Sequence, residues 1–185
     1  FDDCSSPTIA WEAVLCGLAT AAANHLEVAT ADVPSAYLHA TRPAGQPILM
    51  RIQAELTPLL LKASPEGWAK FTCQDGTIVV ELDKALYGLK DSGLLFHRDL
   101  GATLLQHGYE TSDIDPCIFK CFREDRESII LIYVDDLVLI TRDEAERNLI
   151  ISVLGDRYGE LSVQTGNALS ILGVNVIRDT QGIQV

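Results

Sequence analysis

The chain has 185 residues, of which 48% are hydrophobic and 22% are charged, and its formal net charge is −12. This length and composition allow one domain with a sizeable core and a small subdomain, and they exclude disorder as the default state. The acidic balance, taken alone, argues against nucleic-acid binding, because neutralisation of phosphates by Lys and Arg supplies much of that affinity.

The first forty residues are predicted to form a helix, a strand and a short helical turn. A Ser-Pro pair at residues 6–7 suits a helix N-cap and first turn, so a packed helix is expected over residues 7–24. Residues 26–32 alternate apolar and polar side chains, which indicates a strand that ends on an acid. A proline two residues later blocks further pairing, and residues 33–39 are expected to make a short helical turn.

Residues 40–91 are predicted to form a small insert of short elements. The Asp-Gly pair at residues 75–76 is a strong signal for a hairpin turn between two strands. The expected elements are a loop at 41–47, a strand at 48–52, a short helix at 55–63, a turn at 64–67, hairpin strands at 69–73 and 78–82, and a loop at 86–90.

The second half of the chain is predicted to alternate helices and strands. Residues 91–106 are expected to form a helix that stops before Gly108, and residues 143–158 an amphipathic helix. The expected strands are 117–122, 161–163, 169–178 and 182–185, with turns at 123–127 and 179–181. This order predicts an α+β fold, in which an antiparallel sheet has its helices packed on one face.

Residues 128–141 place two adjacent aspartates, Asp135 and Asp136, between two apolar runs rich in β-branched residues. Each run fits a buried strand, so the aspartate pair is expected to mark a hairpin turn. Two like charges beside a hydrophobic core are costly unless something neutralises them, and Mg²⁺, which prefers carboxylate oxygen, would do so. The alternative is an exposed turn that happens to carry two acids.

If Asp32 lay beside this hairpin, three carboxylates could gather around a pair of metal ions. Two ions about 3.5–4 Å apart can hold the attacking and leaving oxygens of an in-line phosphoryl transfer. The spacing in the sequence does not decide whether Asp32 and the hairpin are neighbours.

Four segments, in order along nearly the whole chain, resemble the reverse transcriptase of copia-type LTR retrotransposons. They are residues 32–38 (Asp-Val-Pro-Ser-Ala-Tyr-Leu), 82–90 (Leu-Asp-Lys-Ala-Leu-Tyr-Gly-Leu-Lys), 133–136 (Tyr-Val-Asp-Asp) and 172–174 (Leu-Gly-Val). The resemblance implies a polymerase palm over residues 1–39 and 92–185, and a partial fingers insert over residues 40–91. The thumb and RNase H regions of the family are expected to lie outside this stretch.

The resemblance also implies catalytic residues. Asp32, Asp135 and Asp136 match the aspartates that bind two Mg²⁺ ions, with Mn²⁺ as an alternative metal. The Leu-Gly pair at residues 172–173, with the hairpin near Arg178, resembles the start of the primer grip; the alternative is a plain edge hairpin.

Five further residues match the side of the site that receives the nucleotide. Tyr37 matches the aromatic residue that abuts the sugar and excludes a 2′-hydroxyl, although it could be an ordinary core aromatic. Val33 is expected to approach the triphosphate through its backbone N–H. Tyr87, Gly88 and Lys90 match the segment between fingers and palm that borders the nucleotide and the template; the alternative is a surface loop that caps the next helix.

The implied function is that of an RNA-directed DNA polymerase fragment, which adds dNTPs to a primer 3′-end. Its expected partners are an RNA or DNA template with its primer, the dNTP, and the rest of the Pol polyprotein. An intracellular location is expected, because the five cysteines form no disulfide framework. A membrane span is not expected, because the aspartate pair interrupts the longest apolar run. The alternatives are an inactive or domesticated palm remnant that acts as a structural or interaction module, and a nucleotide cyclase, which would need a glycine-rich turn before the acids.

The sequence departs from the family in two places. Residues 91–96 read Asp-Ser-Gly-Leu-Leu-Phe where the family usually has Gln-Ala-Pro-Arg-Ala-Trp, so an acid appears and an arginine and a tryptophan are lost on the helix expected to face the template. No lysine follows Asp136 that could serve as a general acid for pyrophosphate. The family's basic segment is expected before Ser6, which would account for the acidic charge and predicts weak nucleic-acid binding by this piece alone.

Overall fold

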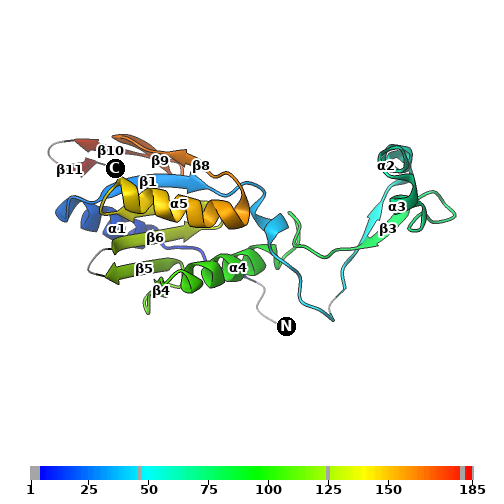
Figure 1. The fold of residues 1–185 in the computed structure, drawn as a ribbon, viewed down its shortest axis with the longest axis horizontal. Helices are drawn as coiled ribbons and strands as arrows, with labels where there is room; N and C mark the ends of the chain where they lie inside the picture. The colour runs from blue at the N-terminus through cyan, green and yellow to red at the C-terminus, as the bar shows by residue number, and fades with distance from the viewer. Residues whose placement is uncertain (1–4, 46, 124–125, 180–181, 185) are drawn as a thin grey trace.

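A six-stranded antiparallel sheet forms the centre of the computed structural model, which describes residues 5–45, 47–123, 126–179 and 182–184 (Figure 1). The strand order is β4-β5-β6-β7-β1-β8. The strands are β4 (Glu110–Thr111), β5 (Ile118–Arg123), β6 (Arg126–Tyr133), β7 (Asp136–Thr141), β1 (Glu27–Asp32) and β8 (Ser162–Gln164). Because β1 lies between β7 and β8, residues from the beginning, the middle and the end of the chain meet on neighbouring strands.

Helices cover both faces of this sheet, so the prediction that they pack on one face is wrong. On one face, Gly17 of α1 (Trp11–Ala23) approaches the side chains of Leu131 and Ile140. On the other face, Gly101 of α4 (Ser92–Gln106) approaches Phe119. The register places Leu131 and Ile140 on the same face and Phe119 on the opposite one, because side chains alternate along a strand.

The apolar character of the central strands explains this two-sided covering. Ile130, Leu131 and Ile132 are consecutive in β6, and each is at most 2% exposed. Consecutive residues of a strand point to opposite faces, so both faces of the central sheet need a cover. The third large helix, α5 (Glu144–Tyr158), lies on the α4 side, as Figure 1 shows, and is capped by Asp143, whose side chain accepts a hydrogen bond from the Glu146 amide at 2.9 Å.

The insert projects from the body of the molecule (Figure 1). Its elements are β2 (Leu49–Ile52), the 3₁₀ turn η2 (Ala54–Leu56), α2 (Thr57–Ala63), α3 (Pro65–Ala69) and β3 (Ile78–Glu81). Two predictions here are wrong. Residues 64–67 were expected as a turn but belong largely to α3, and β3 pairs with β2 rather than with residues 69–73. The turn at 73–77 does form, but α3 occupies the start of the expected partner strand, which leaves only an isolated bridge between Thr72 and Ile78.

Two other predicted elements have different bounds. The first helix begins at Trp11, with extended Ala10 as its N-cap, because Ile9 is buried in a non-helical segment and tertiary burial outweighs the Ser-Pro cap signal. Residues 169–178 are not one strand but the hairpin of β9 (Ala168–Ile171) and β10 (Val174–Asp179), which joins β11 (Gly182–Gln184) in a second small sheet. Leu172 and Gly173 form its two-residue loop, with φ of 51° and 79°.

The remaining predicted elements of the body are present close to their expected positions. The strand that ends on Asp32 is β1, the helical turn after it is η1 (Ala36–His39), and the predicted strand at 161–163 is β8. The predicted turns at 123–127 and 179–181 include residues 124–125 and 180–181, which lie outside the described residues. Of the described helices, none is both long enough and apolar enough to cross a membrane.

Candidate active site

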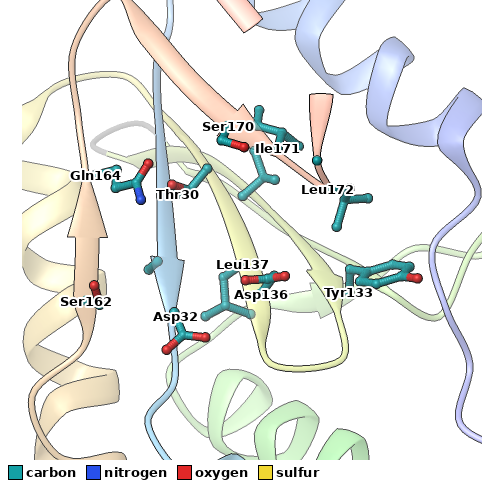
Figure 2. Close-up of a pocket in the computed structure, with 13 residues that line it drawn as sticks. Thr30, Asp32, Tyr133, Asp136, Leu137, Ser162, Gln164, Ser170, Ile171 and Leu172 are labelled. Atoms are coloured by element: carbon teal, nitrogen blue, oxygen red, sulfur yellow. The ribbon is translucent and has the colours of Figure 1, made fainter. Parts of the chain in front are cut away.

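Asp32 and Asp136 are direct neighbours at one end of the sheet. β1 and β7 pair with Asp32 opposite Asp136, and β6 pairs with β7 so that Tyr133 is opposite Asp136. Residues directly opposite in an antiparallel pair point to the same face, with Cβ atoms about 4.5–5.5 Å apart. Figure 2 shows the two exposed carboxylates on adjacent strands, at the edge of a cavity.

Asp135 lies in the two-residue loop between β6 and β7, together with Val134, whose φ is 58°. Its backbone carbonyl accepts a hydrogen bond of 3.1 Å from the amide of Val33, the residue after Asp32. This bond ties the loop to the end of β1, so all three predicted acids belong to one edge of the sheet. The same bond occupies the Val33 amide, and the Val33 side chain is buried, so the approach of this amide to a triphosphate stays a prediction.

The three carboxylates interact electrostatically. Partial burial raises the pKa of Asp136, and the charges of Asp135 and Asp32 raise that pKa further. Each negative neighbour makes ionisation of Asp136 less favourable, so a cation at this edge would offset the repulsion. Within the described ranges, no group of three or more His, Cys, Asp or Glu side chains is arranged to hold a metal ion. The pair of Asp32 and Asp136 nonetheless suits Mg²⁺, which proteins commonly hold through one or two carboxylates together with waters and substrate phosphates.

A cavity of about 430 Å³ opens beside this carboxylate pair. Its floor is the sheet face that carries Thr30, Asp32 and Asp136, and its opposite wall is residues 171–173, which are the last residue of β9 and the loop that leads to β10 (Figure 2). Sequence reasoning did not predict three further polar residues that line it, and these are Ser162, Gln164 and Ser170. They come from β8 and β9, and no local sequence signal indicates that β8 pairs with β1.

Tyr37 and Tyr87 form a second part of the site, outside that cavity. Their ring centroids are 4.4 Å apart, and the Tyr37 ring also meets Phe96 edge-on at 6.4 Å. Tyr87 is 52% exposed, and Tyr37 is partly buried. Partial burial and the charge of Asp135 raise the pKa of both tyrosines. The tyrosine pair therefore lies within electrostatic reach of the aspartate loop.

Gly88 and Lys90 follow Tyr87 in an exposed loop. Gly88 has a φ of 99°, and a Cβ added there would meet nothing within 4 Å, so glycine serves the backbone conformation and not a close approach within this chain. Ser92 closes the loop, because its hydroxyl donates to the carbonyl of Leu86 at 2.7 Å and accepts from the Leu86 amide at 3.1 Å. The structure thus keeps residues 87–90 on the surface, beside the tyrosine pair.

The chain is similar to known proteins over its whole length. The family description "Reverse transcriptase (RNA-dependent DNA polymerase)" matches residues 1–185. The chain is 29% identical over 181 residues to the retrovirus-related Pol polyprotein from transposon TNT 1-94 of Nicotiana tabacum. The aligned region covers 97% of this chain and 12% of that protein. It is 27% identical over 177 residues to the truncated transposon Ty1-A Gag-Pol polyprotein of Saccharomyces cerevisiae, covering 92% of this chain and 13% of the relative.

A further relative is the retrovirus-related Pol polyprotein from transposon RE2 of Arabidopsis thaliana, which is 28% identical over 135 residues, or 72% of this chain and 9% of that protein. The chain thus spans about an eighth or less of the length of these copia-type Pol polyproteins. A family match over all 185 residues means that the chain belongs to the reverse transcriptase (RNA-dependent DNA polymerase) family.

Proposed function

We propose that this chain is the catalytic part of an RNA-directed DNA polymerase, which joins a dNTP to the 3′-end of a primer on an RNA or DNA template. The observation that carries the proposal is the pairing of Asp32 with Asp136, together with the bond that ties the Asp135 loop to Val33. This arrangement gathers acids from two distant segments at one solvent-exposed edge, where a charged substrate and a metal can reach them.

In this proposal Asp32, Asp135 and Asp136 hold two divalent ions, which are Mg²⁺ or alternatively Mn²⁺. When bound, such ions activate the primer hydroxyl, neutralise charge on the transferred phosphoryl group and hold the pyrophosphate. Asp32 and Asp136 supply carboxylate oxygens from rigid strands, whereas Asp135 supplies its own from the loop. Partial burial and the repulsion among the three carboxylates raise the pKa of Asp136, and that repulsion favours binding of cations at this edge.

The two sides of the carboxylate edge suit the two substrates. Tyr37, in contact with the Tyr87 ring, would abut the sugar of the incoming dNTP, and the loop that carries Gly88 and Lys90 would border its phosphates and the template. The cavity under residues 171–173 would hold the primer end near Asp136. We assign residues 1–39 and 92–185 to the palm and residues 40–91 to a part of the fingers, with the rest of an intracellular Pol polyprotein as partner.

The test is Mg²⁺-dependent extension of a DNA primer on an RNA template by the full-length protein that carries this chain. We expect Asp135→Asn to reduce the rate of extension at least about a hundredfold, because it removes a metal ligand while keeping the size of the side chain. Asp113→Asn is the matched control, since Asp113 is an exposed acid that neither lines the cavity nor contributes to the raised pKa of Asp136. Extension that survives Asp135→Asn unchanged would refute the metal-binding assignment.

A second candidate is a palm remnant that serves as a structural or interaction module. Its support is the net charge of −12, which disfavours nucleic acid, and the lack of a preassembled metal cluster in the residues that the structure describes. The same assay separates the two functions, because a remnant would leave the wild-type protein without extension activity in either Mg²⁺ or Mn²⁺.

A further inference from the structure

The insert is joined to the body by two chain segments that run side by side, and we call these residues, 39–42 and 83–85, the neck. The amide of Ala85 donates to the carbonyl of Ala40 at 2.9 Å, and the amide of Arg42 donates to the carbonyl of Asp83 at 3.0 Å. Lys84 adds two bonds of 3.0 Å from its ammonium group, one to the carbonyl of His39 and one to the hydroxyl of Thr41. The neck is therefore a pair of hydrogen-bonded segments with an isolated antiparallel bridge between Thr41 and Lys84, and the loop of residues 86–91 begins where it ends.

A buried ion pair connects the neck to the far end of that loop. The guanidinium of Arg42 binds the carboxylate of Asp91 through two parallel contacts, Nη1 to Oδ1 at 3.0 Å and Nη2 to Oδ2 at 2.9 Å. The Arg42 side chain is only 4% exposed and that of Asp91 is 22% exposed. A guanidinium buried to this degree depends on its carboxylate partner. The acid at residue 91, which departs from the family pattern, is thus neutralised within the protein and is not presented to nucleic acid.

The loop of residues 86–91 has three anchors in all. Ser92 fixes its beginning through the two bonds to Leu86. Tyr87 fixes its middle through a tilted ring contact with Tyr37, and Tyr37 lies in η1, the next element after the end of β1 that carries Asp32, so this anchor is beside the carboxylate edge. The contact of Asp91 with Arg42 fixes its end, and it is the anchor that depends on a charge.

We propose that Arg42 and Asp91 are a positioning pair that sets the loop of residues 87–90 against the carboxylate edge and thereby controls the binding of the dNTP. This inference rests on the polymerase function proposed above. Neither residue touches the carboxylates, so the pair acts through the loop and not on the chemical step. Loss of the pair should consequently change the KM for the dNTP and leave kcat nearly unchanged.

The experiment compares Asp91→Asn with wild type in the full-length protein, by primer extension at varied dNTP and by hydrogen exchange of the backbone amides. We expect the KM for the dNTP to rise about tenfold and kcat to change by less than about twofold. We also expect faster exchange confined to residues 86–91, while β1 and β7 keep their protection. A variant that is merely less stable would instead exchange faster throughout the body.

Two matched variants sharpen the test. Asp83→Asn also removes one negative charge, here from an exposed side chain of the neck. Asp83 takes part in the neck through its backbone carbonyl, which the variant keeps, so both the KM for the dNTP and the exchange of residues 86–91 should stay unchanged. Arg42→Lys keeps the buried charge but loses the two-pronged contact, and should give an intermediate KM, which also serves if Asp91→Asn does not fold.

The outcomes separate this inference from the proposed function. If wild type extends primers, Asp135→Asn does not, and Asp91→Asn and Arg42→Lys retain the wild-type KM, the positioning role is overturned while the polymerase function stands. A fall of kcat with no change of KM in Asp91→Asn would also overturn it. If wild type does not extend primers, or if Asp135→Asn does, the polymerase function fails and this inference fails with it.

Discussion

Replacement of Asp136 by Asn should stabilise the metal-free protein while it abolishes catalysis. Asp32 is directly opposite Asp136, and Asp135 is the residue before it, so three negative charges share one sheet edge. The variant Asp136→Asn keeps the shape of the side chain and removes one of these charges. Its effect on the free energy of unfolding therefore includes both the cost of partly burying the Asp136 charge and the repulsion that a bound cation would relieve.

The magnitude follows from the geometry. Two unit charges about 5 Å apart, as for residues directly opposite in a sheet, repel by about 3 kcal/mol at an effective dielectric constant of about 20 and by about 0.8 kcal/mol in water. Asp32 and Asp136 are both exposed, so solvent screening moves the value toward the lower figure. We expect Asp136→Asn to stabilise the fold by about 1 kcal/mol, which for a chain of this size raises Tm by about 2–4 °C.

The pH dependence of this effect has a definite sign. The pKa of Asp136 is raised in the folded protein, so the folded state holds this proton more tightly than the unfolded chain does. The contribution of Asp136 to stability is thus fully present below the ordinary carboxyl pKa, and it is lost as the pH rises through the raised pKa. Asp136→Asn removes this loss, and its advantage over wild type should appear only above that range.

The assay is thermal unfolding of the 185-residue chain at neutral pH, first with EDTA and then with increasing Mg²⁺. Wild type should have the lower Tm in EDTA and should gain stability with Mg²⁺, because a ligand that binds only the folded state stabilises it. Asp136→Asn should gain less, and Asp113→Asn should behave as wild type in both conditions. If Asp136→Asn lowers Tm in EDTA, or if it gains as much from Mg²⁺ as wild type, then the carboxylates do not form the repulsive, cation-binding edge described above.

Two further predictions concern the core. Gly17→Val should destabilise the fold by about 1–3 kcal/mol, because its Cβ would lie 3.0 Å from a methyl carbon of Leu131. The control is Gly155→Ala in α5, which should be neutral or stabilising because an added Cβ there meets nothing within 4 Å. Denaturant unfolding measures both variants, and equal stability of the two would contradict the packing of α1. Burial raises the pKa of the Cys117 thiol to about 12, so iodoacetamide at pH 8 should modify exposed Cys16 and leave Cys117 unmodified, and prompt labelling of Cys117 in the mass spectrum would show that this part of the core is open.

The sequence by itself determined the local features of this protein. The hairpin of β6 and β7, with its acidic pair at the loop, follows from two apolar β-branched runs around a two-residue turn. The helix that begins after Asp143 follows from a cap residue and an amphipathic pattern. These features depend on residues close together in the chain, and the order of four short motifs was enough to indicate the family.

Only the tertiary structure decided which distant segments meet. The pairing of Asp32 with Asp136 exists because β1 inserts between β7 and β8, a choice made by burial and register and not by spacing along the chain. The same holds for the covering of both sheet faces and for the contact of Arg42 with Asp91, which are 49 residues apart. A long-range contact forms when it buries apolar surface and pairs a buried charge. Both the buried area and the charges that need a partner depend on how the whole chain packs.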